Sequence, residues 1–322
     1  MLKWKLPTLM FLILLFSQAF AAAASTLTSV PSRVISLAPN ITEFVYALGA
    51  GDQLVGRTRF CTFPPEVLSV PVVGSFSHPN LEQILALRPD LCLAAQDGTP
   101  RHVIALIERI GVPVRVFDPA GLNRLAPTVL EMGAVLGREE QAGRLAARIG
   151  ERLERVDRMV MQRLAHSGHH PSTLFQLQTF PLIFAGKGSF VNELIARAGG
   201  VNPLEAANIY PRLGLERVLE LQPEVILTVY MGGRTGLGGP VMSQGADWGQ
   251  WQSLPAVRQK RVYSVDPDIF CRPSPRSLDA LEELADILHP QGAGVHIQGE
   301  PVEGSAPEPA AALDNAGAEV GS

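Results

Sequence analysis

The sequence predicts an α/β protein with two lobes, each built on a central, mostly parallel sheet, and joined by one long backbone helix. Three observations lead to this prediction. Short apolar strands alternate with helical segments in two separate parts of the chain. One eleven-residue motif occurs once in each part, and a long polar run without proline lies between the two parts.

The polar run over residues 139–165 is the predicted backbone helix. Its apolar residues recur at steps of three or four, which places them on one face of a helix with 3.6 residues per turn. They are Leu145, Ile149, Leu153, Val156, Val160 and Leu164. At 1.5 Å per residue this helix would be about 40 Å long, longer than a small domain is wide. The alternative, an ordinary surface helix within one domain, stays open from this run alone.

The repeated motif is the strongest indication of two similar lobes. Residues 81–91 match residues 215–225 with five of eleven positions identical. Each copy predicts a short helix, a proline that ends it and a buried strand. Two lobes of like topology joined by one helix would enclose a cleft, which is the usual place for a small-molecule site.

In the N-terminal half, short apolar runs bounded by turn residues predict the strands. The expected strands cover 33–37, 53–56, 91–94 and 113–117, and the expected helices cover 41–49, 80–88 and about 101–110. Asn40 and Glu43 stand three residues apart and resemble a capping box at the start of the first helix. A helical lead-in over 121–137 precedes the backbone helix.

The C-terminal half restarts the same alternation. The expected strands cover 173–178, 225–230 and 262–265, and the expected helices cover 189–198, 215–221, 247–259 and 275–288. Residues 179–188 are expected to form a loop, and so are the glycine-rich residues 232–245.

Both ends of the chain are expected to lie outside the lobes. Residues 1–24 combine Lys3 and Lys5, a short apolar run and small residues before a cleavage site, which predicts a removable signal peptide and a periplasmic protein. Residues 291–322 are rich in Gly, Ala and Pro and contain five acidic residues but no Lys or Arg, which predicts a disordered tail. The remaining segments are an N-terminal lobe over 25–120, a helical linking segment over 121–168 and a C-terminal lobe over 169–290.

Composition narrows the functional classes. Of 322 residues, 46% are hydrophobic, enough for two domains with separate cores, and the net charge of −4 gives no reason to expect a nucleic-acid partner. Three cysteines allow at most one disulfide, which the spacing does not assign. Cys92 lies in an apolar strand and is predicted to be buried. Cys61 and Cys271 each follow a phenylalanine in a loop and are candidates to face a cleft.

Three stretches of the chain resemble one protein family. Residues 33–43, 80–90 and 268–276 are similar to the helical-backbone substrate-binding proteins of ABC importers for metal chelates, and the similarity runs from about residue 33 to residue 288. It implies a monomeric periplasmic protein without a cofactor of its own, which hands a chelate to a permease dimer in the inner membrane. Cobalamin-binding members look most similar, so a corrinoid (vitamin B12) is the expected ligand. Members for ferric siderophores and for haem share the fold, and either chelate is the alternative.

The resemblance also implies a set of ligand-binding residues. Aromatic residues of the family's cleft match Phe60 and Phe76 in the first lobe and Phe180 and Tyr210 in the second, and the polar pair that contacts the corrin side chains matches Asp268 and Arg272, with Phe270 between them. The chain departs from the pattern at Ala95, where the cobalamin-binding members carry a large aromatic residue, and Phe60 and Tyr210 replace aromatic residues of other kinds.

These residue types fit a flat macrocycle on physical grounds as well. A ring more than a nanometre wide needs broad apolar surfaces and a few hydrogen-bonding groups for its rim of amides. Aromatic side chains in strand-to-helix loops supply such surfaces, and one Asp–Arg pair supplies polar groups. The alternative for each aromatic residue is that it packs the core of its own lobe.

Glu82 and Glu216 occupy equivalent places in the repeated motif. In the family, such a pair of glutamates docks onto arginines of the two permease subunits, and the resemblance implies the same role here. Electrostatic complementarity of this kind gives steering and register more than raw affinity. The alternative is two solvated glutamates at helix starts, where the helix dipole favours negative charge.

The sequence argues against catalysis. No histidine pairs with Cys, Asp or Glu at metal-ligand spacing, and the G-x-S-x-G and H-E-x-x-H motifs are absent. His78 is a candidate axial ligand for a chelated metal. An anionic siderophore would need several cations, for which the candidates are Arg57, Arg59, Arg212 and Arg272. An exported chelate-processing enzyme is the alternative from another functional class.

Overall fold

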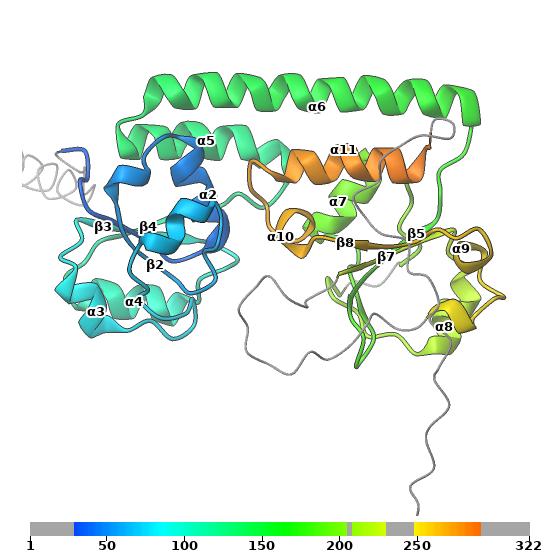
Figure 1. The fold of residues 1–322 in the computed structure, drawn as a ribbon, viewed down its shortest axis with the longest axis horizontal. Coiled ribbons are helices and arrows are strands. Elements are labelled where there is room, and N and C mark those ends of the chain that lie inside the picture. The colour runs from blue at the N-terminus through cyan, green and yellow to red at the C-terminus, as the bar shows by residue number, and fades with distance from the viewer. Residues whose placement is uncertain (1–28, 205–207, 230–247, 291–322) are drawn as a thin grey trace, which may run out of the picture. The chain divides into compact units, whose positions relative to one another are not determined.

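The computed structural model describes residues 29–204, 208–229 and 248–290 (Figure 1). The predicted signal peptide (1–24), the glycine-rich loop (232–245) and the predicted tail (291–322) lie outside these residues. The chain divides into two compact units. The first unit runs to Glu154 and also includes Arg272–Leu278, and the second unit comprises Arg155–Cys271 and the chain from Asp279 onward.

The first unit is built on a four-stranded parallel sheet with the order β2-β1-β3-β4. Its strands are β1 (Val34–Ser36), β2 (Leu54–Arg57), β3 (Leu91–Ala95) and β4 (Val114–Phe117). All five residues of β3 are buried, as expected for a strand of a parallel sheet that is covered on both faces. The sequence predicted all four strands to within one residue at each end.

Helices cover both faces of this first sheet (Figure 1). α2 (Pro39–Ala47) and α5 (Leu122–Leu136) lie on one face, and α3 (Leu81–Ala86) and α4 (Arg101–Arg109) lie on the other. Ile84 of α3 and Ile107 of α4 are completely buried in one apolar cluster with Ile35 and Cys92 of the sheet. Burial of each such isoleucine contributes roughly 1.5–3 kcal/mol to folding, so these short helices are held mainly by their apolar faces.

The second unit contains a sheet with the equivalent order β6-β5-β7-β8. Its strands are β5 (Thr173–Gln178), β6 (Ile183–Phe184), β7 (Val225–Val229) and β8 (Val262–Val265). The pairs β5–β7 and β7–β8 are parallel, whereas β6 pairs antiparallel with β5. The sequence predicted β5, β7 and β8 but treated residues 179–188 as a loop, because a strand of two residues shows no alternation of apolar and polar residues.

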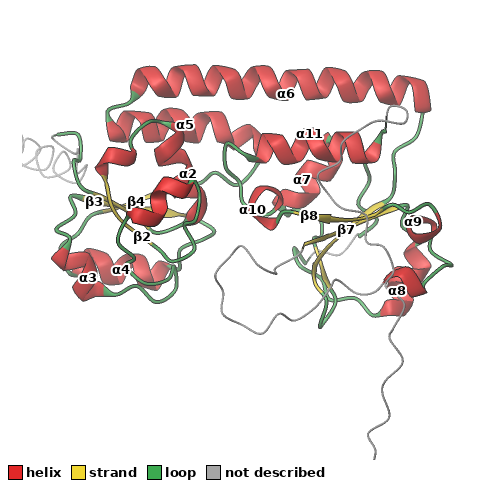
Figure 2. Cartoon of the chain, viewed as in Figure 1, coloured by secondary structure: helices red, strands yellow, loops and turns green. Residues whose placement is uncertain are grey.

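Helices again cover both faces of the sheet (Figure 2). α7 (Phe190–Arg197) and α11 (Ser277–Leu288) lie on one face, and α8 (Leu215–Leu221) and α9 (Pro255–Arg258) lie on the other. The prediction of one helix over 247–259 is wrong. The chain instead forms a 3₁₀ turn (Trp248–Gln250) and then the short α9. Pro255 disfavours the helical conformation for the residue before it, and Leu254 is accordingly extended with φ −76° and ψ 132°.

Helix α6 (Glu139–Ser167) is one uninterrupted helix that begins in the first unit and ends in the second. Five of its six predicted stripe residues are buried, and Leu164 is half-buried. A Cβ atom on Gly133 of α5 would lie 2.3 Å from the Cβ atom of Ala142, so the close approach of α5 and α6 requires glycine at this position. Within the ranges that the structure describes, no helix has both the length and the apolar composition that a membrane crossing requires.

The repeated motif folds in the same way in both units. The residue before the motif's proline is left-handed in each copy, with φ values of 47° and 45°. The acidic residue after that proline then holds the start of the neighbouring strand. The Asp90 carboxylate accepts a hydrogen bond from the backbone N–H of Ser32 (2.8 Å), and the Glu224 carboxylate accepts one from the N–H of Ser172 (3.2 Å).

The predicted capping box at Asn40 and Glu43 is wrong. α2 begins at Pro39 with Ala38 in the capping position, and no side chain caps the helix. Proline is favoured in the first turn of a helix, where its missing N–H goes unused, so the helix starts before Asn40. The Glu43 side chain is instead buried and paired with Arg276.

Candidate ligand-binding site

Three of the predicted site residues follow the carboxyl ends of strands, the edge at which open α/β sheets commonly bind ligands. Phe60 follows β2 in the first unit. In the second unit Phe180 follows β5, and Asp268 follows β8. The fold therefore places these side chains at functionally suitable edges of the two sheets, and each unit contributes its own group.

In the first unit, Phe60 and Phe76 form a pair. Their ring centroids are 5.6 Å apart and the ring planes are inclined by 50°, which is a favourable geometry for two aromatic side chains. Phe60 is half-buried, and Phe76 is 39% exposed. Two loops that are distant in the sequence thus present one partly exposed aromatic surface.

The loop that carries Phe76 is fixed by backbone geometry. Gly74 has φ +100°, and a Cβ atom there would lie 2.6 Å from the carbonyl oxygen of His78, so this turn requires glycine. The backbone N–H of Ser75 donates to that same carbonyl (3.1 Å), and the N–H of Arg59 donates to the carbonyl of Gly74 (2.9 Å). The second of these bonds ties the Phe76 loop to the Phe60 loop, so the pair is held by the main chain as well as by ring contact.

Arg57, considered above as a cation for an anionic ligand, has a structural role. Its guanidinium donates hydrogen bonds to the carbonyl oxygens of Thr58, Cys61, Leu68 and Val70 at distances of 3.0 to 3.3 Å. The residue is only 6% exposed. Its donors are committed to closing the loop after β2, so Arg57 is not available to a ligand.

The structure also reveals an aromatic residue that the sequence reasoning missed. Phe63 is 39% exposed, and the guanidinium of Arg276 lies over its ring at 3.7 Å from the centroid, which is a cation–π contact. Arg276 also donates two hydrogen bonds to the Glu43 carboxylate, at 2.9 and 2.7 Å. Phe63 lies in the same loop as Phe60. A search of that loop for further aromatic residues could have found Phe63 from the sequence.

In the second unit, Phe180 and Tyr210 are both exposed, at 88% and 55%. Phe180 lies in the turn between β5 and β6. The segment with Tyr210 is held against β6, because the N–H of Gly186 donates to the carbonyl of Ile209 (2.8 Å) and Ile183 bridges to Arg212. Hydrogen bonds of the main chain therefore position both aromatic residues around β6, an element that the sequence did not predict.

The predicted site residues that follow β8 differ in burial and in the unit to which they belong. Asp266 caps the short helix α10 (Pro267–Phe270), which carries Asp268 on its first turn. Phe270 is completely buried, and its ring stacks on that of Phe175 with centroids 6.0 Å apart and planes inclined by 29°. The Phe270 ring is therefore a core side chain of the second unit rather than an exposed surface for a ligand, because the turn of α10 directs it onto the sheet. Asp268 and Arg272 belong to different units of the chain.

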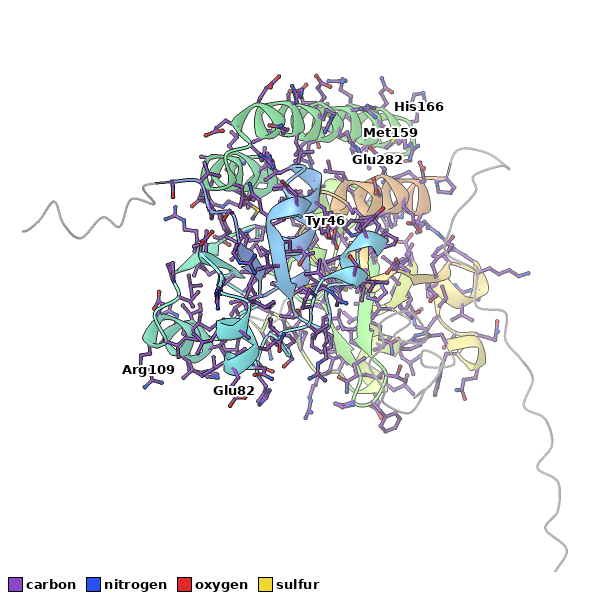
Figure 3. The ribbon with its side chains drawn as sticks, turned by 60° about the vertical axis from the view of Figure 1, so that its left-hand side comes forward. Tyr46, Glu82, Arg109, Met159, His166 and Glu282 are labelled. Atoms are coloured by element: carbon purple, nitrogen blue, oxygen red, sulfur yellow. The ribbon has the colours of Figure 1, made fainter. Side chains whose placement is uncertain are left out.

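Glu82 and Glu216 are exposed in the first turns of α3 and α8. Figure 3 shows Glu82 on the outer side of α3 with its side chain directed away from the ribbon. Asn80 caps α3 by accepting a hydrogen bond from the N–H of Gln83 (3.0 Å), which fixes where the helix begins. The two glutamates thus occupy equivalent, solvent-facing positions on equivalent elements.

The three cysteines are free thiols, and two of them are buried. No disulfide joins the three cysteines, all of which lie in the described part of the chain. Burial raises the pKa of the Cys92 thiol to about 12 and also raises the pKa of Cys61, which is completely buried rather than facing a cleft. In the described ranges, no three His, Cys, Asp or Glu side chains gather as a metal ion would require.

Comparison with known proteins identifies the family. A family model described as periplasmic binding protein matches residues 34–269. The chain belongs to this family. Its members bind solutes rather than catalyse reactions on them, and the two-unit α/β architecture described above is the fold of its structurally known members.

Individual relatives agree with this assignment. The chain is 30% identical over 285 residues to a vitamin B12-binding protein of Vibrio cholerae, covering 87% of this chain and 98% of the relative. It is 28% identical over 269 residues to an uncharacterized ABC transporter substrate-binding lipoprotein of Bacillus subtilis, covering 82% of each. The family is thus one of substrate-binding components of ABC transporters.

Solved structures of proteins named for two kinds of ligand show the same fold. The periplasmic vitamin B12 binding protein of Vibrio cholerae superposes with a TM-score of 0.68 at 30% identity, over 80% of this chain and 97% of that chain. A periplasmic heme-binding protein from Roseiflexus superposes with a TM-score of 0.65 at 27% identity, over 80% and 98%. Both ligands are macrocyclic metal chelates.

Proposed function

We propose that this protein captures a corrinoid such as cobalamin in the periplasm, with the aromatic side chains at the carboxyl ends of both sheets, and delivers it to an ABC importer in the inner membrane. The observation that carries the proposal is the partly exposed Phe60–Phe76 pair, on a chain that is 30% identical to a vitamin B12-binding protein over nearly its whole length. Cleavage of a signal peptide and action as a monomer are parts of the same proposal.

The chemistry of the ligand supports a corrinoid. A corrin ring offers a broad apolar face and a rim of neutral amides, so it needs aromatic surfaces and single hydrogen bonds more than charge. Phe76, Phe180 and Tyr210 provide exposed aromatic surface. Each such anchor adds contact area with little loss of side-chain freedom, because an aromatic side chain has only two rotatable bonds.

The distribution of cations disfavours a ferric siderophore. An anionic siderophore needs several cations that can contact it, and Arg57 is committed to four backbone carbonyls. Of the four arginines considered, only Arg59, Arg212 and Arg272 remain as candidates. A corrinoid has a neutral rim and therefore suits a surface with few cations better than a highly negative siderophore does.

Haem is the second candidate, favoured by the heme-binding relatives of known structure and by one side chain. His78 is exposed in the loop that carries Phe76, and its Nδ1 atom lies 2.9 Å from the hydroxyl of Ser77. The bond fixes one ring nitrogen, so Nε2 is the atom that would bind a chelated iron. An exported chelate-processing enzyme has less support, because the family consists of binding proteins.

Delivery to a permease requires a docking surface. We assign this role to Glu82 and Glu216, which present one carboxylate each at equivalent exposed positions of the two units. A protein with two equivalent acidic contacts fits a transporter whose two permease subunits are related by twofold symmetry. Opposite charges at such contacts would speed encounter and fix orientation.

Calorimetry on the mature protein tests the ligand directly. Cyanocobalamin, cobinamide, haemin and a ferric siderophore are titrated side by side under identical conditions. The proposal expects cyanocobalamin to bind with a dissociation constant below about 1 μM, which corresponds to about −8 kcal/mol. Heat from haemin with none from cyanocobalamin would establish the second candidate instead, and heat from the siderophore alone would reject both.

A further inference from the structure

The segment Arg272–Leu278 returns to the first unit after the chain has formed most of the second. It begins with Arg272, the residue that the family resemblance leads us to expect at the ligand, and it leads into α11. A return segment of this kind keeps its place only through the contacts it makes in the unit that it rejoins. Arg276 makes such contacts with Glu43 and Phe63, and two buried serines hold the shape of the segment itself.

The contact of Arg276 with Glu43 is the strongest of these. Two parallel N–H···O bonds of 2.9 and 2.7 Å join the guanidinium to the carboxylate, and the guanidinium also covers the Phe63 ring. The Glu43 side chain is only 3% exposed, and that of Arg276 is 20% exposed. A carboxylate buried to this degree needs a hydrogen-bonded partner, and the planar guanidinium supplies two donors in a fixed geometry.

Hydrogen bonds of two serine hydroxyls connect Arg276 to Arg272 within the segment. Ser277 Oγ donates to the carbonyl of Arg272 (2.9 Å) and accepts from the N–H of Ser274 (3.0 Å). The N–H of Arg276 donates to Ser274 Oγ (3.3 Å), and both serines are completely buried. The main chain of Arg272 is therefore linked through two hydroxyls to the residue that Glu43 holds.

We propose that Glu43 and Arg276 are positioning residues for the ligand, because their ion pair on the Phe63 ring fixes the Arg272–Leu278 segment and hence the place from which Arg272 reaches the ligand. This proposal rests on the proposed function, since it needs a chelate that Arg272 contacts. It adds that specificity at this contact depends on a buried pair that does not touch the ligand. It also gives Glu43 a positioning role in place of the helix capping that the sequence pattern had suggested.

A double-mutant cycle separates positioning from a general loss of structure. Glu43→Gln keeps the shape of the side chain but removes its charge, and Arg272→Ala removes the contact. We expect Glu43→Gln to weaken cyanocobalamin binding about tenfold in the unmodified protein and less than about twofold in the Arg272→Ala protein, because residues that act through one another are not additive. Equal losses in both backgrounds, or no loss in either, would overturn the proposal.

A milder variant keeps the test decisive if Glu43→Gln does not fold. Phe63→Leu removes the cation–π contact but leaves the Glu43–Arg276 ion pair, and the same cycle with Arg272→Ala is expected to show a smaller but equally background-dependent loss. In the ligand-free Phe63→Leu protein, hydrogen exchange in Arg272–Leu278 should be faster than in the unmodified protein. An unchanged exchange rate there would count against the role of the Glu43–Arg276 pair in fixing this segment. If the unmodified protein binds haemin but not cyanocobalamin, the cycle is run with haemin. If it binds neither, the proposed function fails, whereas a failed cycle in a binding protein refutes only the positioning role.

Discussion

Replacement of Arg57 by methionine should destabilise the first unit without a specific effect on any ligand. The substitution keeps an apolar stem but removes the donors to four carbonyl oxygens, two of which lie in buried hydrogen bonds and two in partly buried ones. A buried polar group left without its partner costs about 1–3 kcal/mol, so the two buried bonds alone predict a loss of about 3 kcal/mol. With about 2.1 cal/mol/K of unfolding entropy per residue, a chain of 322 residues would lose about 4–5 °C of Tm.

Urea unfolding followed by circular dichroism measures this loss, and Arg59→Met is the matched control. Arg59 lies two residues further along and is exposed, so its replacement should change the unfolding free energy by less than about 0.5 kcal/mol. The reasoning is refuted if Arg57→Met is as stable as the control but binds haemin or a siderophore much more weakly. Arg57 would then serve the ligand rather than the loop.

Three further predictions follow from the site and the repeated motif. Phe76→Ala should weaken cyanocobalamin binding about tenfold in calorimetry, because the exposed half of an aromatic pair is lost, while the Tm changes little. Glu82→Ala combined with Glu216→Ala should leave that affinity unchanged but slow uptake about tenfold in vesicles that contain the importer. The free energy of unfolding should fall in urea titrations as the pH drops below the ordinary values of 3.8 for Asp90 and 4.5 for Glu224. Asp90→Asn and Glu224→Gln should each flatten this dependence.

The sign of the acid effect follows from the direction of the shifts. The backbone N–H of Ser32 is the main cause that lowers the pKa of Asp90. Burial alone would raise the pKa of Glu224, but hydrogen bonds from His169 and from the N–H of Ser172 outweigh it and lower this pKa. A carboxyl with a lowered pKa stabilises the fold above its unfolded pKa and loses that contribution as the pH falls through the folded value. Steeper acid sensitivity in the two variants than in the parent would contradict this account.

Matched control variants test whether the effects of Phe76→Ala and of the Glu82→Ala, Glu216→Ala pair are specific. Val116→Ala removes a partly exposed apolar side chain from β4 and should leave cyanocobalamin binding within about twofold of the parent. Glu108→Ala combined with Glu220→Ala removes two exposed glutamates from α4 and α8 and should not slow uptake. If this control pair slows uptake as much as the proposed docking pair does, net charge rather than a specific contact explains the loss.

The sequence revealed the parts of the fold that depend on local periodicity. The buried strands, the repeated motif and the stripe on α6 all carry a regular spacing of apolar residues, and all three are confirmed. The break before α9 was missed because the apolar spacing over 247–259 continues through Pro255, whose steric effect on Leu254 outweighs it. The two-residue strand β6 was missed because its pairing with β5 is a tertiary contact with no local signal.

The candidate site, too, could be predicted from the sequence only in part. The loops with Phe60, Phe76, Phe180 and Tyr210 could be placed from the sequence, and the structure adds that Phe60 and Phe76 touch. Residue type alone could not show that Phe270 packs in the core, since a phenylalanine beside a loop suits either role. The partner of Glu43 was equally hidden, because Arg276 follows it by 233 residues. Long-range pairs of this kind leave no pattern in one sequence.

A crystal structure of the mature protein grown with cyanocobalamin tests the central claim most directly. The account predicts that the corrin ring lies within about 4 Å of Phe60 or Phe76 on one side and of Phe180 or Tyr210 on the other, the range of apolar contact. Cobalamin bound away from all four aromatic residues, or crystals in which these residues enclose no corrin at saturating ligand, would contradict it.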